Sequence, residues 1–142
     1  MVDRERILAK LDELHAYEAE LSAVLPQDFA EYMASSAKRR AIERLLQISI
    51  ECVLDICNLL VAGLRLGLPA EEEDLFARLE TAGTISPEVA TALRAIRRFR
   101  NILVHEYGAI NNHIVFTVAT QKWQDIEAFT REVLRALERS HS

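Results

Sequence analysis

An arginine, a histidine and a tyrosine lie close together in the stretch RFRNILVHEYG, residues 98–108. Arg100 precedes His105 by five residues, and Tyr107 follows that histidine by two. Histidine can take up and release protons near neutral pH, and arginine can bind a phosphate group and stabilise the charge that develops on it. A tyrosine hydroxyl supplies a further donor or acceptor. These side chains suffice for metal-free cleavage of RNA, in which the ribose 2′-hydroxyl attacks the adjacent phosphate.

The spacing of these residues leaves two interpretations open. Asn101 and His105 are four residues apart, so they share one face of a helix. Arg100 points about 140° away from His105 on an ideal helix. The side chains therefore converge on one ligand only if the helix end distorts or if a second subunit contributes. The alternative is a capped helix end with a structural histidine.

The remaining histidines are weaker candidates for chemistry. His15 lies within an expected helix, where a structural role is the simpler interpretation, His113 lies in a stretch near the motif, and His141 lies in the C-terminal tail. No spacing of His, Cys or carboxylate residues predicts a metal site, and no glycine-rich phosphate loop is present. We therefore expect neither a metal nor another cofactor.

Length and composition predict one soluble domain spanning residues 1–142. Leu, Ala, Glu and Arg dominate, with only four glycines and three prolines, which favours helices over a sheet. Cys52 and Cys57 are about 140° apart around a helix, so they are expected to be reduced, as in a cytoplasmic protein. No signal peptide or uninterrupted apolar run of about 18 residues is present, so no membrane association is expected.

The net charge of −5 argues against nonspecific attraction of nucleic acid over the whole surface. The positive charge is mostly arginine, whose planar guanidinium binds phosphate with two hydrogen bonds. It gathers in two clusters, namely Arg39, Arg40 and Arg44, and Arg94, Arg97, Arg98 and Arg100.

Hydrophobic periodicity and helix boundary signals predict an all-α, up-and-down bundle of about four to five helices that dimerises. The stretch at residues 113–118 has strand propensity but no partner strand, so we interpret it as extended chain or as the entry to the last helix. A short helical piece is expected at residues 28–33. The longer helices are expected at residues 3–24, 36–66, 72–82, 87–104 and 118–139.

The central helix, residues 36–66, is apolar on most sides but keeps one polar stripe. Its members recur every three or four residues: Arg44, Gln47, Glu51, Asp55 and Asn58. Buried unpaired polar groups cost about 1–3 kcal/mol each, so the stripe must face water, a polar cleft or a partner. We expect it to line the motif cleft, with Asp55 or Glu51 orienting Arg100 or His105. The alternative is a solvated face.

The segment RNILVHEY resembles the Arg-x4-His-x-Tyr motif of the HepT-like toxins in the HEPN superfamily of nucleases. The match is complete at Arg100, His105 and Tyr107, and Asn101 also fits the superfamily pattern. The segment RAIERLLQISIECVLDICNLL, residues 40–60, resembles the central helix of the family, including its Glu-Arg pair at residues 43 and 44 and Asp55.

The resemblance implies a homodimer with the motifs at a shared cleft, acting as a metal-independent endoribonuclease toxin of a type II toxin-antitoxin pair. Arg100 and His105 would be catalytic, and Asn101 and Tyr107 supporting. It also implies an antitoxin that resembles minimal nucleotidyltransferases and attaches AMP to Tyr107. The alternatives are a non-catalytic helical dimer that docks a nucleotidyltransferase, and a plain structural helical domain.

Overall fold

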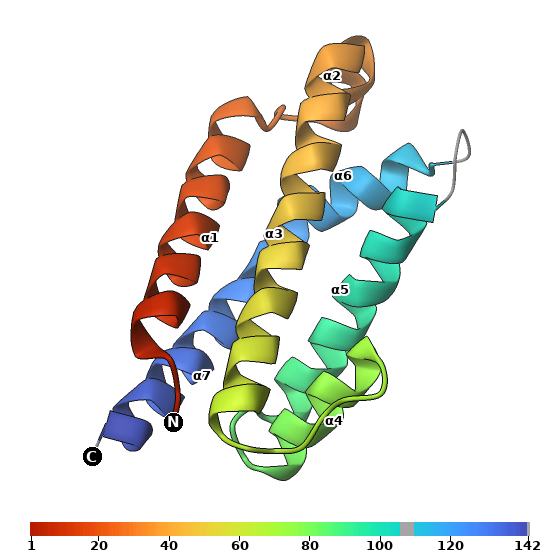
Figure 1. Ribbon diagram of the computed structural model, residues 1–142. Coiled ribbons are helices and arrows are strands. Elements are labelled where there is room, and N and C mark those ends of the chain that lie inside the picture. Colours follow the sequence, from red (N-terminus) through yellow and green to blue (C-terminus); the bar gives the residue numbers. More distant parts are fainter. Residues whose placement is uncertain (106–109, 142) are drawn as a thin grey trace.

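The computed structural model describes residues 1–105 and 110–141, and these residues fold into helices alone (Figure 1). The all-α prediction is therefore confirmed, but the described chain has seven helices rather than the four to five predicted. The helices are α1 (Arg4–Val24), α2 (Phe29–Ala34), α3 (Ser36–Gly63), α4 (Glu72–Thr81), α5 (Pro87–His105), α6 (Asn112–Gln121) and α7 (Trp123–His141).

The four long helices α1, α3, α5 and α7 alternate in direction, and α2, α4 and α6 are short helices in the connections between them (Figure 1). α3 packs against α1, α2, α4, α5 and α6, so it is the central helix of the bundle. Because α3 and α5 run in opposite directions, the first turns of α3 lie at the same end of the bundle as the last turn of α5 (Figure 1).

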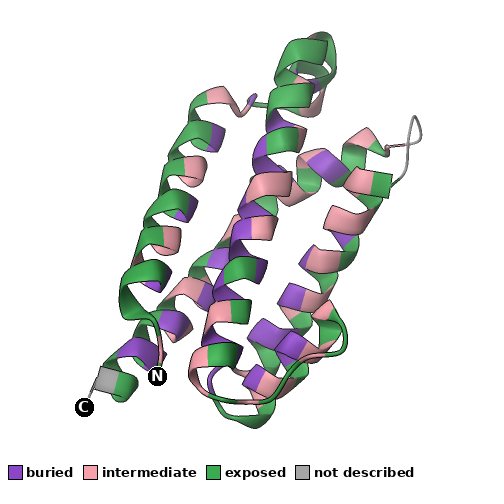
Figure 2. Cartoon of the chain, viewed as in Figure 1, coloured by how far each residue is buried: buried purple, intermediate pink, exposed green. Residues whose placement is uncertain are grey.

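α3 carries much of the hydrophobic core, and buried positions recur along its length in Figure 2. Ile42, Ile56, Cys57 and Leu60 are fully enclosed. The length and composition of α3 alone would allow it to cross a membrane, although no uninterrupted apolar run was found in the sequence. Since 61% of its most apolar window is buried inside the bundle, α3 is the core helix of this fold.

Local capping signals fix the starts of several helices where the sequence predicted them. The side chain of Asp3 accepts a hydrogen bond from the backbone N–H of Arg6 at 3.2 Å, and Asp28 caps α2 in the same way at 2.8 Å. Each bond satisfies one of the backbone donors that a helix start leaves without a partner.

α3 ends three residues before the predicted boundary at residue 66, because the turn forms at Arg65 and not at the later glycine. Arg65 has a φ of 56°, the left-handed conformation that usually belongs to glycine at this position. Its N–H donates to the carbonyl of Ala62, and the N–H of Leu66 donates to the carbonyl of Val61. This pair of bonds is the Schellman motif, and it satisfies carbonyls that the helix end exposes.

Of the two interpretations of residues 113–118, that of extended chain was wrong, because these residues are helical and form part of α6. Asn111 caps that helix by accepting from the backbone N–H groups of His113 and Ile114. Phe116 then packs edge-on against Phe29, with ring centroids 5.8 Å apart. This packing overrides the strand preference of β-branched residues. The helix is interrupted at Lys122, so the single helix predicted at residues 118–139 is divided between α6 and α7.

Candidate functional site

α5 carries the motif, and its start is fixed by two hydrogen bonds. The hydroxyl of Ser86 accepts from the N–H of Val89 at 3.2 Å, and Glu132 of α7 accepts from the N–H of Ser86 at 2.7 Å. Pro87 occupies the first helical position, where its missing N–H costs nothing. The buried face of α5 includes Leu93 and Phe99, which fixes the rotation of the helix and so directs its polar residues outward.

Arg100 is held on two sides by polar side chains. Its Nε donates to Oδ1 of Asn101 at 3.0 Å, and its Nη2 donates to Oε1 of Glu72 at 2.5 Å. Only 15% of the Arg100 side chain is exposed, whereas 38% of the Glu72 side chain is exposed. The structure thus brings Arg100 and Asn101 together and adds a carboxylate from α4.

Glu72 was not singled out by the sequence, because it lies on another helix, within an acidic run at residues 71–74. Its Oε1 also accepts from Nε of Arg97 at 3.0 Å. One carboxylate oxygen therefore contacts two guanidinium groups of α5. A second interhelical ion pair joins Arg94 to Glu80 at 3.4 Å, at the other end of α4.

His105 is the last residue of α5 and is exposed. α5 is helical up to this residue, so Arg100 and His105 project about 140° apart around its axis. Asn101 lies on the face of His105, one turn earlier, and is bonded to Arg100. Asn101 thus orients Arg100 from the helix face that carries His105. Tyr107 lies outside the described residues.

The polar stripe of α3 has partners other than the motif in the described chain. Nε2 of Gln47 donates to Oε1 of Glu51 at 3.0 Å, and Asp55 forms an ion pair with Lys10 of α1 at 3.2 Å. Asp55 is exposed and Glu51 is half-buried. The carboxylate bonded to Arg100 is that of Glu72, so the expectation that Asp55 or Glu51 orients Arg100 is not met by these bonds. Their role as supporting residues stays a prediction.

The other histidines differ from His105 in their surroundings. His15 is exposed on the surface of α1. The ring of His113 stacks on Phe29, with centroids 3.7 Å apart and an interplanar angle of 12°, so it contributes to the packing of α6 against α2. The described part of the chain contains no group of three or more His, Cys, Asp or Glu residues placed to hold a metal.

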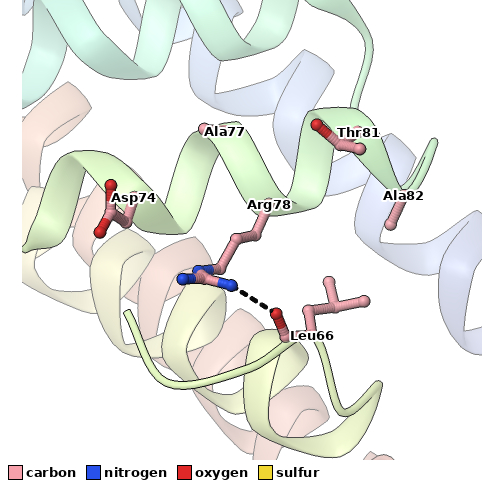
Figure 3. A pocket seen from close by; sticks show the side chains of 6 residues that line it. All are labelled: Leu66, Asp74, Ala77, Arg78, Thr81 and Ala82. Atoms are coloured by element: carbon pink, nitrogen blue, oxygen red, sulfur yellow. Dashed lines mark hydrogen bonds between the residues drawn. The ribbon is translucent and has the colours of Figure 1, made fainter. Parts of the chain in front are cut away.

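A hollow of about 480 Å³ lies where α4 meets the end of α3, and none of the motif residues lines it (Figure 3). Arg78 crosses its floor and donates from Nη1 to the carbonyl of Leu66 at 2.7 Å and from Nη2 to that of Leu68 at 3.2 Å. These bonds tether the loop that follows α3. The hollow is therefore a feature of the connection between α3 and α4.

Comparison with known proteins places this arrangement in a family. The model of the family described as Ribonuclease HepT-like matches residues 9–133. A relative from Aphanizomenon flos-aquae named tRNA nuclease HepT is 27% identical over 103 residues, which cover 72% of this chain and 70% of the relative. A relative from Shewanella oneidensis named mRNA nuclease HepT is 32% identical over 91 residues, covering 64% of this chain and 68% of the relative.

Solved structures share the fold over nearly the whole chain. The tri-AMPylated HEPN toxin of Shewanella oneidensis, solved in complex with an MNT antitoxin, superposes with a TM-score of 0.85 at 24% identity, covering 95% of this chain and 99% of the toxin. The cytosolic protein YutE of Bacillus subtilis superposes with a TM-score of 0.84 at 20% identity, covering 98% of this chain and 93% of that protein. At these identities the likeness establishes the fold.

Proposed function

The chain belongs to the Ribonuclease HepT-like family and is an endoribonuclease, and from this premise we propose that it cleaves RNA at the end of α5 with Arg100 and His105. The observation that carries the proposal is the environment of Arg100. The guanidinium is oriented by Asn101 and Glu72, and an exposed histidine ends the same helix five residues later. An oriented guanidinium and an accessible imidazole, which two copies of the chain can bring together, suit a phosphate ester that must be held while protons move.

In the proposed reaction, the 2′-hydroxyl of a ribose attacks the adjacent phosphorus. The bond from phosphorus to the 5′-oxygen breaks, which leaves a 2′,3′-cyclic phosphate on one product and a 5′-hydroxyl on the other. Arg100 binds the phosphate and stabilises its developing charge. His105 takes the proton of the attacking hydroxyl or gives one to the leaving oxygen. We propose no metal, because the substrate supplies the nucleophile and arginine supplies the positive charge.

We propose that the active form is a homodimer with its two motifs at a shared cleft. On α5, Arg100 and His105 project to different sides, so a second copy offers the imidazole or the guanidinium that one chain directs elsewhere. Three large apolar side chains are exposed on the helices next to the motif: Met33, Ile102 and Ile114, each between 41% and 48%. Twofold pairing is the commonest way to bury such side chains. Light scattering that gives a monomer at micromolar concentration would contradict this.

The test of the activity is cleavage of an end-labelled RNA in excess chelator by three purified proteins: wild type, His105→Ala and His15→Ala. We expect His105→Ala to lose cleavage. His15→Ala is the matched control, because His15 is exposed on another helix, and it should cleave as the wild type does. Equal cleavage by both variants would assign the activity to a contaminant and overturn the proposal.

We propose that the chain is the toxin of a type II toxin-antitoxin pair in the cytoplasm, and that its partner is a minimal nucleotidyltransferase. The related toxin that is solved with an MNT antitoxin is tri-AMPylated, which supports a partner of that class. Tyr107 is the proposed acceptor of AMP. Each AMP would add negative charge to the motif and occupy space that RNA needs, so modification would oppose RNA binding.

Coexpression with the antitoxin followed by mass spectrometry tests this control. The peptide that contains Tyr107 should gain the mass of one or more AMP groups, and Tyr107→Phe should lose the gain and resist neutralisation. Tyr17→Phe, on α1, is the matched control and should be modified as the wild type is. If Tyr107→Phe is still modified and still neutralised by the antitoxin, Tyr107 is not the acceptor of AMP. If the wild type is modified but never cleaves RNA, the alternative of a non-catalytic dimer that docks the transferase is favoured.

A further inference from the structure

Glu72 is the one carboxylate that contacts Arg100 in the described part of the chain, and its position on α4 is set by packing rather than by the motif. Its Oε1 accepts from Nη2 of Arg100 at 2.5 Å and from Nε of Arg97 at 3.0 Å. Glu72 lies 28 residues before Arg100 in the sequence. Because α4 packs against both α3 and α5, these two contacts fix the position of the carboxylate next to Arg100.

The two acceptors on Arg100 occupy one edge of its guanidinium. Nε–H and one N–H of Nη2 point to the same side of the planar group, and they are bonded to Asn101 and Glu72 respectively. The N–H groups of Nη1 have no acceptor among the described residues. The free edge, formed by Nη1 and the outer N–H of Nη2, has the geometry that binds two oxygens of a phosphate.

Charge in this cluster suits the same ligand. Arg97 and Arg100 carry two positive charges, and Glu72 carries one negative charge at neutral pH. The cluster keeps one net positive charge, which matches the single negative charge of a phosphodiester. Side-chain exposures of 15% for Arg100 and 22% for Arg97 place the cations at the edge of the bundle, where a ligand can approach.

We infer that Glu72 is a positioning residue for RNA cleavage, which fixes the side edge of the Arg100 guanidinium so that its free edge meets the scissile phosphate. The inference rests on the proposed function. Glu72 acts through Arg100 and does not contact the substrate. Without the negative charge of the carboxylate, the bond to Nη2 is weaker and the guanidinium can rotate away from the phosphate, while the net positive charge of the cluster rises.

The decisive variant is Glu72→Gln, which keeps the shape of the side chain, removes its charge and leaves Nη2 of Arg100 only a neutral, weaker acceptor. Two controls accompany it. Glu73→Gln makes the same charge change at the next residue, which is exposed, and Glu80→Gln removes the other ion pair between α4 and α5, that of Arg94. Loss of geometry at the reacting group should lower kcat of Glu72→Gln by about tenfold or more. Its KM should be unchanged or lower, because the local positive charge increases. Both controls should stay within about twofold of wild type in each constant.

A second readout does not depend on activity. In the wild type, the paired bonds should slow rotation about the Nε–Cζ bond of Arg100, which ¹⁵N-detected NMR of the arginine side chains measures. Glu72→Gln should speed this rotation, whereas Glu80→Gln should leave it unchanged. If His105→Ala and wild type cleave RNA equally, the proposed function fails, but the rotation rate still decides whether Glu72 fixes Arg100.

Three outcomes would overturn the inference. One is an unchanged or raised kcat of Glu72→Gln, which would make Glu72 a spectator or a competitor of the phosphate. Another is an equal loss in Glu80→Gln, which would show a general effect on the packing of α4. The last is an unchanged rotation rate. If Glu72→Gln does not fold, Glu72→Asp replaces it, since the charge at the start of α4 is kept while the carboxylate is about 1.5 Å too short. The same loss of kcat is expected from it.

Discussion

Replacement of Arg100 by lysine separates the charge of this residue from its shape. Lysine keeps the positive charge, and its ammonium can still reach a single acceptor such as Glu72. It cannot donate to Asn101 from the Nε position while also presenting two parallel N–H groups to a phosphate. The substitution therefore removes geometry at constant charge.

The size of the effect follows from the bonds that are lost. A hydrogen bond that involves a charged group contributes about 1.5–3 kcal/mol. If one such bond to the phosphate is lost in the transition state, kcat/KM should fall by about 10- to 150-fold, since about 1.4 kcal/mol corresponds to a factor of ten. The folded state should tolerate the change, because Arg100 lies at the edge of the bundle and not in its core.

The assay measures initial rates of cleavage of a fluorogenic RNA over a range of concentrations. Arg98→Lys is the matched control, because Arg98 lies on the same helix, is exposed and has no hydrogen bond or ion pair within the described ranges. It should keep kcat/KM within about twofold. An Arg100→Lys enzyme within about threefold of wild type would refute the argument, because simple charge would then be sufficient.

Three further predictions concern stability, measured by urea denaturation. The buried hydroxyl of Tyr32 has no partner among the described residues, so Tyr32→Phe should raise the free energy of unfolding at neutral pH by about 1 kcal/mol. Burial raises the pKa of Tyr32 from 10.0 to about 12, so the free energy of unfolding of the wild type should fall as the pH rises from 10 through 12. The free energy of unfolding of Tyr32→Phe should fall less over this range. An equal fall in both proteins would contradict the prediction. A Cβ at Gly63 would lie 2.6 Å from Cα of Val2, so Gly63→Ala should lower the free energy of unfolding by about 1–3 kcal/mol. An unchanged denaturation midpoint would show that the N-terminal residues move away from the new methyl group without loss of stability. Arg65 holds a left-handed φ of 56°, so Arg65→Gly should add about 1 kcal/mol, and a loss would mean that the arginine side chain outweighs this strain.

The helices that could be predicted from the sequence are those with local boundary signals. Asp3 and Ser86 precede α1 and α5, and each caps its helix by accepting from a backbone N–H group. α6 could not be predicted in this way, because its β-branched residues favour a strand in isolation. Its helical form depends on contacts of Phe116 with Phe29 and Tyr32, which lie far away in the sequence.

The candidate site divides in the same manner. The last two turns of α5 contain Arg100, Asn101 and His105, so their relative positions could be predicted from the sequence. The carboxylate that contacts Arg100 could not be predicted, since Glu72 lies on another helix, at its start, among other acidic residues. Asp55, which the stripe pattern favoured instead, is paired with Lys10 through the packing of α1 on α3.

The ends of the RNA products test the central claim most directly. Purified protein is incubated in excess chelator with an oligonucleotide, and the fragments are weighed by mass spectrometry. Attack by the 2′-hydroxyl predicts a 2′,3′-cyclic phosphate on the upstream fragment and a 5′-hydroxyl on the downstream one, and a single 2′-deoxy substitution at the cleaved position should abolish cleavage there. Fragments with a 5′-phosphate and a 3′-hydroxyl, or cleavage at the deoxy position, would contradict the account, because water would then be the nucleophile.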